Sequence, residues 1–460
     1  MKKASTTPKI KEVQALKPFL NGILFKAQDG KKDFFEDDLG QKLKQWIQLT
    51  LTASLKKAQM VEASFENLVK AITQYAELAH HEYVGNVFQD YWMEKFLNYP
   101  NLFHDKAEKV KFASMGDVLK NRYLQEIKLF REFLWQLDKM PHHPPIDLWS
   151  PKAFRPLVDE SANSFLAQSR MEIKKQILDK AIAIDVLVKS IADYFFRCGQ
   201  GKFARFTAFR WHSSASGPYG ELVGIARLDP IGLNDLVGYE EIRQPLLDNI
   251  QAFLDGKSAN NVLIYGDRGT GKSSTVKALL NEYASQGLRL IEVSVQALKS
   301  YFDILKEIAP RHEKFILFID DMSFEENETS YKELKGILEG SLESKPTNVI
   351  LIATSNRRHL IRETFQDHQE GHQQESDIHG EDTVQEKLSL ADRFGLVISF
   401  YAANQETYLR IVEKWAKKET IAMPLPELHR LALQWALRYN QRSGRTARQF
   451  ILNLKSSWHS

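Results

Sequence analysis

The sequence is poor in cysteine, in long apolar runs and in excess charge of either sign. Cys198 is the only cysteine among 460 residues, which excludes an intrachain disulfide framework and a thiolate zinc cluster. No stretch approaches the length of a membrane-spanning helix, and the basic N-terminus is not followed by the apolar run of a signal peptide. Basic side chains number 62 and acidic ones 59, so composition alone does not indicate a nucleic-acid or membrane-surface protein. We therefore expect a soluble cytoplasmic protein without membrane insertion.

The first part of the chain has the apolar spacing of helices. From about Gly40 to Gly201, apolar residues recur every three or four positions, as from Val118 to Leu137 and from Ile173 to Phe195. Cys198 continues this pattern and is expected in the core. Clustered prolines in segment 139–156 interrupt the helical region. We predict a mostly helical N-terminal region over residues 1–204.

The residue composition of the sequence changes after Gly201. Residues 205–235 mix aromatic, basic, glycine, serine and proline residues, and we interpret them as a linker. The stretch "RFTAFRWH" within them interleaves basic and aromatic side chains as single-strand nucleic-acid binders do. Because the stretch is brief and the net charge is only +3, a short packed segment bridging two domains is the favoured interpretation.

Beyond residue 236, short apolar runs alternate with helical patterns, which is typical of a parallel α/β sheet covered on both faces. Residues 236–402 are the predicted α/β core, and residues 403–460 return to three amphipathic helices that form a predicted small helical lid. The five predicted strands are "NVLIYGD", "LRLIEVS", "FILFIDD", "NVILIATSN" and "LVISFY".

The segment "GDRGTGKS" matches the phosphate-binding pattern GxxxxGK(S/T), with an apolar strand before it and a helical pattern after it. The glycines let the backbone curl so that its amides point at phosphates, and the following helix adds the positive end of its dipole. Lys272 is expected to reach the β and γ phosphates, and the Ser273 hydroxyl to ligate Mg²⁺. The predicted nucleotide-binding residues here are Gly266, Asp267, Arg268, Gly269, Thr270, Gly271, Lys272, Ser273 and Ser274.

Carboxylates follow the predicted strand "FILFIDD". The metal that bridges the phosphates must also be held from the protein side, so Asp320, at the strand end, is the expected Mg²⁺ acid. Asp321 stands where many ATPases of this class carry a glutamate that polarises water, and its reach is about 1.5 Å shorter. Three alternatives remain: Asp321 acts on a closer water, Glu325 or Glu326 takes the role, or hydrolysis is slow and the protein mainly senses ATP.

Other polar positions end or precede strands. Asn356 falls at the carboxyl end of a predicted strand, where it could orient the attacking water or cap the next helix. Arg393 precedes the last strand and could reach the γ-phosphate of a neighbouring subunit or form a salt bridge.

Arg445 and Arg448 begin the last helix and could contact the nucleotide from within the subunit. His368 and His372 have the spacing of a helical metal pair, but a mobile acidic insertion over 366–386 explains the composition better.

Together, "LVGYEE", "GDRGTGKSS", "FILFIDDMSF", "ATSNRRHL", "LADRFGL" and "SGRTARQF" resemble the motifs of the AAA+ ATPase superfamily. The resemblance covers about 230 C-terminal residues, and it implies a P-loop α/β core with a five-stranded parallel sheet in the order 5-1-4-3-2, a helical C-terminal lid, and a ring, often of six subunits, with ATP at the interfaces. The residue roles that it implies are Lys272 and Ser273 in Walker A, Asp320 and Asp321 in Walker B, Asn356 as sensor 1, Arg393 as arginine finger, Arg448 ahead of Arg445 as sensor 2, and Val237 and Gly238 at adenine.

More narrowly, "YGDRGTGKSS", "IDDMSFEE", "ATSNRRHL" and "EKLSLADRFGL" resemble the bacterial domain-of-unknown-function family 815. The expected function is an Mg²⁺-dependent ATPase that couples hydrolysis to remodelling or assembly of a macromolecular target. Two alternatives are a slow-turnover ATP-sensing scaffold and a nucleic-acid loader or initiator. The target is expected to be a protein or a nucleic acid, and the surface of this chain that would bind it carries no readable motif.

Overall fold

The computed structural model describes residues 14–20, 34–52, 58–138, 164–213, 220–322, 329–339, 346–356 and 393–458, with Lys152, Phe154 and Leu157. The chain divides into two compact units, residues 1–206 and residues 207–460. Each unit has its own hydrophobic core.

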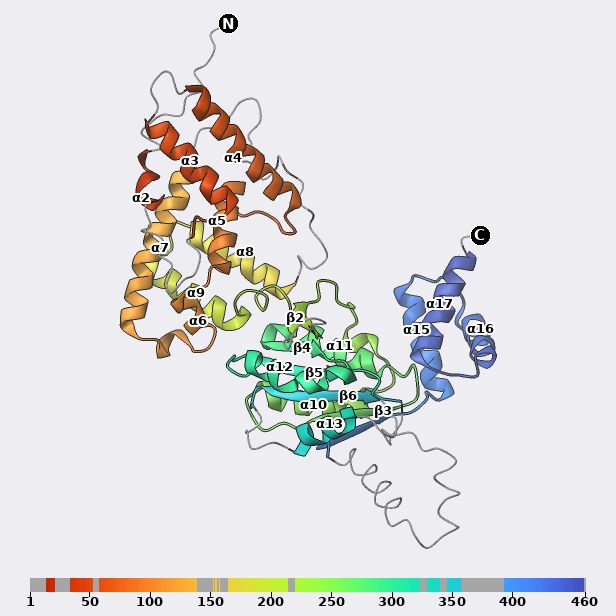
Figure 1. Cartoon of the computed structure of the whole chain (residues 1–460). Helices are drawn as coiled ribbons and strands as arrows, with labels where there is room; N and C mark the ends of the chain where they lie inside the picture. The colour runs from red at the N-terminus through yellow and green to blue at the C-terminus, as the bar shows by residue number, and fades with distance from the viewer. Residues whose placement is uncertain are drawn as a thin grey trace. The chain divides into compact units, whose positions relative to one another are not determined.

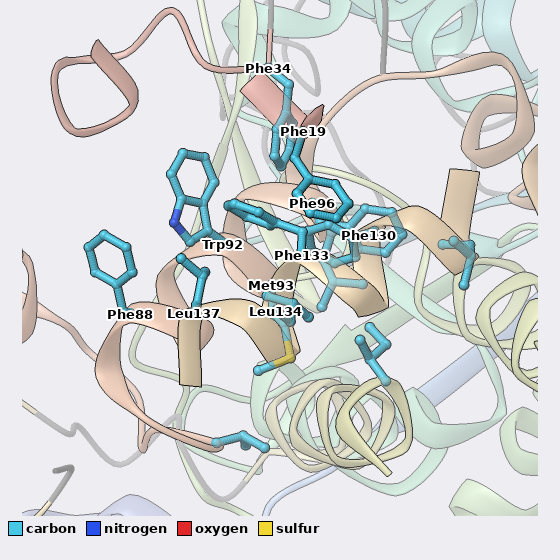
Figure 2. Close-up of a cluster of buried hydrophobic side chains, with 14 of the residues drawn as sticks. Phe19, Phe34, Phe88, Trp92, Met93, Phe96, Phe130, Phe133, Leu134 and Leu137 are labelled. Carbon is cyan, nitrogen blue, oxygen red and sulfur yellow. The ribbon is translucent and has the colours of Figure 1, made fainter. Parts of the chain in front are cut away.

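The described part of the first unit is built of helices, as the apolar spacing predicts (Figure 1). Aromatic rings fill much of its core. Trp92 and Phe133 meet edge to face at 5.5 Å, and Phe96 stacks on Phe130 at 4.6 Å (Figure 2). Such ring pairs add about 0.5–1.5 kcal/mol each to the burial of their area. The helices are α2 (Lys17–Leu20), α3 (Asp38–Thr52), α4 (Ala58–Leu78), α5 (Val87–Asn98), α6 (Leu102–Ala107), η2 (Phe112–Ser114), α7 (Asp117–Asp138), α8 (Phe165–Leu178) and α9 (Ile184–Cys198).

Details of the predicted apolar stripes differ from the structure. Cys198 is fully buried, as expected. Val118, however, is 85% exposed, because it lies in the first turn of α7 on the side away from the core. The stripe from Ile173 to Phe195 spans two helices, since α8 is capped at Asp179 and α9 begins at Ile184.

The described part of the second unit contains a seven-stranded sheet in the order β2-β1-β4-β5-β6-β3-β7. The five predicted strands are all present and lie in the predicted relative order, with β3 parallel to both of its neighbours, β6 and β7. Crossovers between non-adjacent parallel strands account for this order. The strands are β1 (Ala208–His212), β2 (Glu221–Gly224), β3 (Val262–Gly266), β4 (Leu288–Glu292), β5 (Lys314–Ile319), β6 (Val349–Ser355) and β7 (Leu396–Phe400).

Our prediction of five strands was wrong, because β1 and β2 form within the segment 205–235 that we interpreted as a linker. β1 pairs parallel to β4 and antiparallel to β2. In β1, Arg210 and His212 are exposed on either side of the buried Trp211, and Arg210 donates to Glu292 at 2.7 Å. Alternating polar residues and an antiparallel partner are the opposite of the buried parallel pattern that identified the other strands. The basic and aromatic residues of this stretch thus belong to the edge region of a sheet.

Both faces of the parallel strands are covered. Val262 and Ile264 of β3 pack in a cluster with α10 and α11, whereas Leu263 between them packs in a cluster with η7 and α13. This arrangement explains why the strands lack polar alternation. The covering elements and their neighbours are η5 (Leu233–Asp235), α10 (Glu240–Leu254), α11 (Lys272–Tyr283), η6 (Ala284–Gln286), η7 (Val295–Ser300), α12 (Tyr301–Ile308) and α13 (Thr329–Glu339).

Three helices follow β7: α15 (Gln405–Lys418), α16 (Leu425–Arg438) and α17 (Gly444–Trp458). They lie together at the blue end of the chain in Figure 1 and share one core, in which Tyr408, Ala432 and Phe450 are buried. The Tyr408 hydroxyl donates to the Ala432 carbonyl at 3.2 Å. The predicted amphipathic patterns of this region therefore correspond to three helices.

Candidate functional site

A cleft of about 800 Å³ opens at the carboxyl ends of the parallel strands. Parallel α/β sheets place ligand sites at this edge, because the strand-to-helix loops converge there. The cleft is bounded by the loop between β3 and α11, by the residues after β5 and β6, by the segment around Leu236, and by α15 and α17. Its lining includes Leu236, Val237, Tyr239, Arg243, Arg268, Gly269, Thr270, Gly271, Lys272, Ser273, Ser274, Asp320, Asp321, Thr354, Asn356, Ile411, Trp415, Arg445 and Arg448.

The loop from Gly266 to Gly271 depends on glycine. Gly266, Gly269 and Gly271 all have positive φ, and Gly271 is the N-cap of α11. A Cβ at Gly266 would lie 2.0 Å from the Phe400 carbonyl oxygen, so no side chain fits there. The loop thereby brings its amides and the start of α11 to the cleft, which is the arrangement that binds phosphates.

Lys272 is buried at the first position of α11 and curls back over the loop. Its Nζ donates to the carbonyls of Gly266 and Asp267, both at 2.8 Å, and to Asn356 Oδ1 at 3.1 Å. Burial lowers the pKa of this amine, and the nearby carboxylates, led by Asp321, partly oppose that shift. An ammonium held by neutral acceptors at the mouth of an amide-lined loop is suited to receive a phosphate oxygen.

Asp320 follows β5 and faces the start of α11. Its Oδ1 accepts hydrogen bonds from Ser273 Oγ at 2.5 Å and from Thr354 Oγ1 at 2.6 Å. A carboxylate beside a hydroxyl offers the hard oxygen ligands that Mg²⁺ prefers, and Mg²⁺ commonly keeps several waters beside one or two protein ligands. In the described residues, no group of three or more histidine, cysteine or acidic side chains is arranged to hold a metal ion. Ser273 and Asp320 therefore fit a sparsely ligated Mg²⁺.

Asp321 has a left-handed backbone, with φ of +50°. This conformation is uncommon for a residue other than glycine, although aspartate tolerates it better than most. Its carboxylate accepts a hydrogen bond from Asn356 Nδ2. The structure thus brings together the carboxylate and the amide that we expected to act on water. Glu325 and Glu326, the alternatives to Asp321, lie outside the described residues, as do His368, His372 and the insertion over 366–386.

Apolar side chains also line the cleft. Val237 lines it together with Leu236, whereas Gly238 does not. The Gly238 amide donates to the Glu240 carboxylate at 2.9 Å. A Cβ at Gly238, where φ is +91°, would lie 2.1 Å from a methyl group of Thr407 in α15. This contact fixes the loop against the first C-terminal helix.

Hydrogen bonds join the glycine loop to the C-terminal helices. The Arg445 amide donates to the Gly269 carbonyl at 3.3 Å, and Gln441 Nε2 donates to the Arg268 carbonyl at 2.6 Å. Arg448 lies over the Trp415 ring at 5.1 Å, within the range of a cation–π contact. Arg445 and Arg448 of the last helix therefore both line the cleft within one chain.

Three further predicted site residues do not line the cleft. Gly266 packs against the Phe400 backbone, and the Asp267 carboxylate accepts from the Ala402 amide at 2.7 Å, which makes it a support for the loop. Arg393 lies just before β7, half-buried and away from the lining. Sequence reasoning also missed residues that do line it, namely Thr354, Trp415, Leu236, Tyr239, Arg243 and Ile411. Thr354, two residues before Asn356 in a buried strand, had the clearest signal, since a hydroxyl there must find partners.

Comparisons with known proteins give one family and several distant structures. A family model described as "Protein of unknown function (DUF815)" matches residues 204–458, more than half of the chain. Solved structures of Thermotoga maritima RuvB are similar to part of the chain. A point mutant of that protein has 16% sequence identity and a TM-score of 0.36, and the match covers 50% of this chain and 66% of the mutant chain. The structure described as the RuvB Holliday junction branch migration motor has 14% identity and a TM-score of 0.31, with 49% and 72% covered.

The chain spans just under two thirds of the RuvB mutant chain. No curated protein matches the sequence. None of the helices in the described residues combines the length and apolar composition that a membrane crossing requires.

Proposed function

Because the chain belongs to the DUF815 family, whose function is unknown, we propose an activity from the residues of its own cleft. The proposed activity is Mg²⁺-dependent binding of ATP and hydrolysis of its β–γ bond, coupled to remodelling or assembly of a macromolecular target. The observation that carries the proposal is the position of Lys272, which lies inside a glycine loop and within hydrogen-bonding reach of Asn356, beside two acids.

The phosphate end of the cleft carries groups suited to phosphoryl transfer. The amides between Gly266 and Ser273 and the ammonium of Lys272 would neutralise the β and γ phosphates. Ser273 and Asp320 would hold Mg²⁺, which when bound offsets charge on the phosphate oxygens. Asp321 would accept a proton from the attacking water, and Asn356 would orient that water.

At the other end, Val237 and its apolar neighbours would receive the adenine ring. The three C-terminal helices would act as a lid, because their residues Arg445 and Arg448 line the same cleft as the glycine loop. Both arginines are placed to contact the nucleotide phosphates from within the subunit.

Arg393 has a different proposed position. It does not line the cleft of its own chain, so a role in hydrolysis requires a second copy whose cleft it completes. The AAA+ resemblance implies a ring, often a hexamer, in which such an arginine stabilises charge in the neighbour's transition state. We propose a homo-oligomer on this basis.

Phosphate release and oligomer size test the activity together. We expect ATP with Mg²⁺ to be hydrolysed and to increase the oligomer size measured by light scattering. Arg393→Ala should lower turnover at least about 100-fold while ATP still binds. Arg430, an exposed arginine on α16, offers the matched control, and Arg430→Ala should leave turnover unchanged. Equal turnover in Arg393→Ala and wild type would contradict a role for Arg393 in a neighbour's site.

A slow-turnover ATP sensor is a second candidate function. It is favoured by the hydrogen bond from Asn356 Nδ2 to the Asp321 carboxylate. In this arrangement the proposed base and the proposed water-orienting amide bind each other instead of a water molecule. This candidate predicts nucleotide-dependent assembly with little phosphate release. Asp321→Asn separates the two functions: a large loss of turnover supports the hydrolytic machine, and unchanged turnover removes Asp321 as the base.

The target can be sought with the same variant. Asp321→Asn held in the ATP state should retain its target, which affinity capture and mass spectrometry would identify. A nucleic-acid loader additionally predicts binding to DNA or RNA that weakens steeply with salt, and flat titrations at low salt would remove that alternative.

A further inference from the structure

Thr354 lies near the end of the buried strand β6 and touches both acids that follow the neighbouring strand β5. The residue is 1% exposed. We propose that Thr354 is a positioning residue for hydrolysis, whose hydroxyl holds Asp320 and Asp321 in the arrangement that the reaction requires. This inference rests on the proposed ATPase function of the same cleft.

The hydroxyl has one proton and two lone pairs, and the structure uses them in two directions. It donates to Asp320 Oδ1 at 2.6 Å and accepts from the Asp321 amide at 2.9 Å. The Thr354 carbonyl in addition accepts from the Met322 amide at 2.7 Å. One residue of β6 thereby fixes three consecutive residues after β5.

The Asp321 backbone gives this contact its importance. A left-handed backbone is strained for a residue other than glycine, so the conformation persists only where the surroundings hold it. Besides Thr354, the Asp321 amide has a longer contact of 3.1 Å to Asp320 Oδ1. Without the hydroxyl, the Asp321 amide would keep only this weaker contact, and the Asp321 carboxylate would be free to leave Asn356.

The Thr354 hydroxyl also affects Asp320, one of the two proposed Mg²⁺ ligands. Asp320 Oδ1 accepts from Thr354, from Ser273 and weakly from the Asp321 amide. Because two strong donors set the direction of this carboxylate, removal of one loosens the geometry that Ser273 and Asp320 present to the ion. The hydrogen bonds of Lys272 go to the glycine loop and Asn356 instead, so phosphate binding without metal should be insensitive to the hydroxyl.

Thr354→Val removes the hydroxyl at nearly constant volume, and Thr354→Ser keeps it. We expect Val at this position to lower kcat about 10- to 100-fold while KM for Mg·ATP rises no more than about 10-fold, and Ser to restore most of the rate. Two further readouts need no turnover. The gain in ATPγS affinity on adding Mg²⁺ should shrink about 3- to 10-fold in Thr354→Val, and amide exchange in peptides covering residues 320–322 should become faster.

Thr50→Val is the matched control, since Thr50 is also buried, donates to the Trp46 carbonyl at 2.7 Å and lies in the helical unit. It should change none of these quantities. The proposal is overturned if Thr354→Val and Thr354→Ser have the same effects. It is also overturned if Thr354→Val lowers the ATPγS affinity measured without Mg²⁺ by as large a factor as it lowers the gain in affinity on adding Mg²⁺. If wild type releases no phosphate, the proposed hydrolysis fails, and the Mg²⁺ and exchange readouts still decide the role of Thr354.

Discussion

The two units place the same kinds of charge in opposite ways. In the helical unit, Asp90, Glu94, Arg170 and Lys174 form a buried set with equal numbers of acids and cations. Arg170 makes a bidentate contact with Glu94, at 2.8 Å from both Nε and Nη2, and Lys174 Nζ contacts Asp90 at 2.8 Å and Glu94 at 2.5 Å. Every charge in this set is satisfied by another member.

In the cleft, Lys272 has neutral acceptors, and Asp320 and Asp321 have neutral donors. The pKa values reflect the difference. Burial opposes ionisation of Asp90 and Glu94, but Lys174 for the first and Arg170 for the second lead the contacts that outweigh it, so both pKa values are lowered. For Lys272, burial prevails and the pKa is lowered. The charges of the helical unit neutralise one another within its core. The charged groups of the cleft have neutral partners and can therefore still bind a charged ligand.

The largest expected effect comes from Lys272→Ala. Loss of the ammonium should weaken ATP binding at least about 100-fold and abolish phosphate release, because the proposed role of this group is to neutralise the β and γ phosphates. Stability should change little or rise, since a buried cation held by neutral acceptors is removed. Isothermal titration with ATP and urea unfolding measure the two quantities. Lys306→Ala on α12, an exposed lysine with 77% side-chain exposure, serves as the control.

Next in size is Lys174→Met in the helical unit. It leaves two buried acids against one cation and should lower the free energy of unfolding by about 3–5 kcal/mol, with ATP affinity unchanged. Lys175→Met, one position on and exposed, should cost less than about 0.5 kcal/mol. Urea unfolding of the full chain compares them. Similar losses in both variants would show that the buried set has no special role.

Acid should weaken the helical unit in two steps. His104 is fully buried between the Tyr99 carbonyl and the Tyr123 hydroxyl, and burial lowers its pKa to about 3. The unfolded chain takes up this proton near pH 6.5, so stability falls below that pH, by up to about 1.4 kcal/mol per pH unit.

Asp90 and Glu94, with lowered pKa values, stabilise the fold above about pH 4 and lose that contribution only as pH falls through their folded values. The urea concentration at the unfolding midpoint, measured at about pH 7, 5.5 and 4, follows the loss of stability attributed to His104. His104→Gln should make the stability nearly independent of pH between about pH 6.5 and 4. An unchanged dependence on pH would exclude His104 as the cause of this loss.

The smallest expected effect is that of Arg448→Gln. Arg448 lines the cleft but is exposed to solvent, so water screens its charge, and ATP affinity should fall only about 3- to 10-fold. Arg430→Gln on α16 controls for loss of a surface charge. An effect as large as that of Lys272→Ala would mean that Arg448 is a main phosphate ligand and that the contrast between the two cations is smaller than we infer.

The glycine loop and the five predicted strands could be found because both signals are local. "GDRGTGKS" carries its own geometry, and continuous apolar runs identify strands buried on both faces. Strands β1 and β2 were missed because Arg210 and His212 of β1 face solvent and its partner β2 pairs with it in the antiparallel direction.

The clustering of the site depends on contacts across the sheet. No spacing in the sequence places Thr354 against Asp321, or Arg448 against Trp415, since 33 residues separate the first pair. The left-handed backbone of Asp321 was equally invisible, because aspartate is compatible with several conformations. The residue types of the site could be predicted from the sequence. The distances between these residues could be known only from the structure.

Trp415 has a practical consequence of a spectroscopic kind. Among the tryptophans in the described part of the chain, it is the one that lines the cleft, and its ring carries the Arg448 guanidinium on one face. An indole in this position changes its emission when a nucleotide alters its polarity or moves the guanidinium. Stopped-flow fluorescence, compared between wild type and Trp415→Phe, would therefore time the arrival and departure of nucleotide in the unlabelled protein.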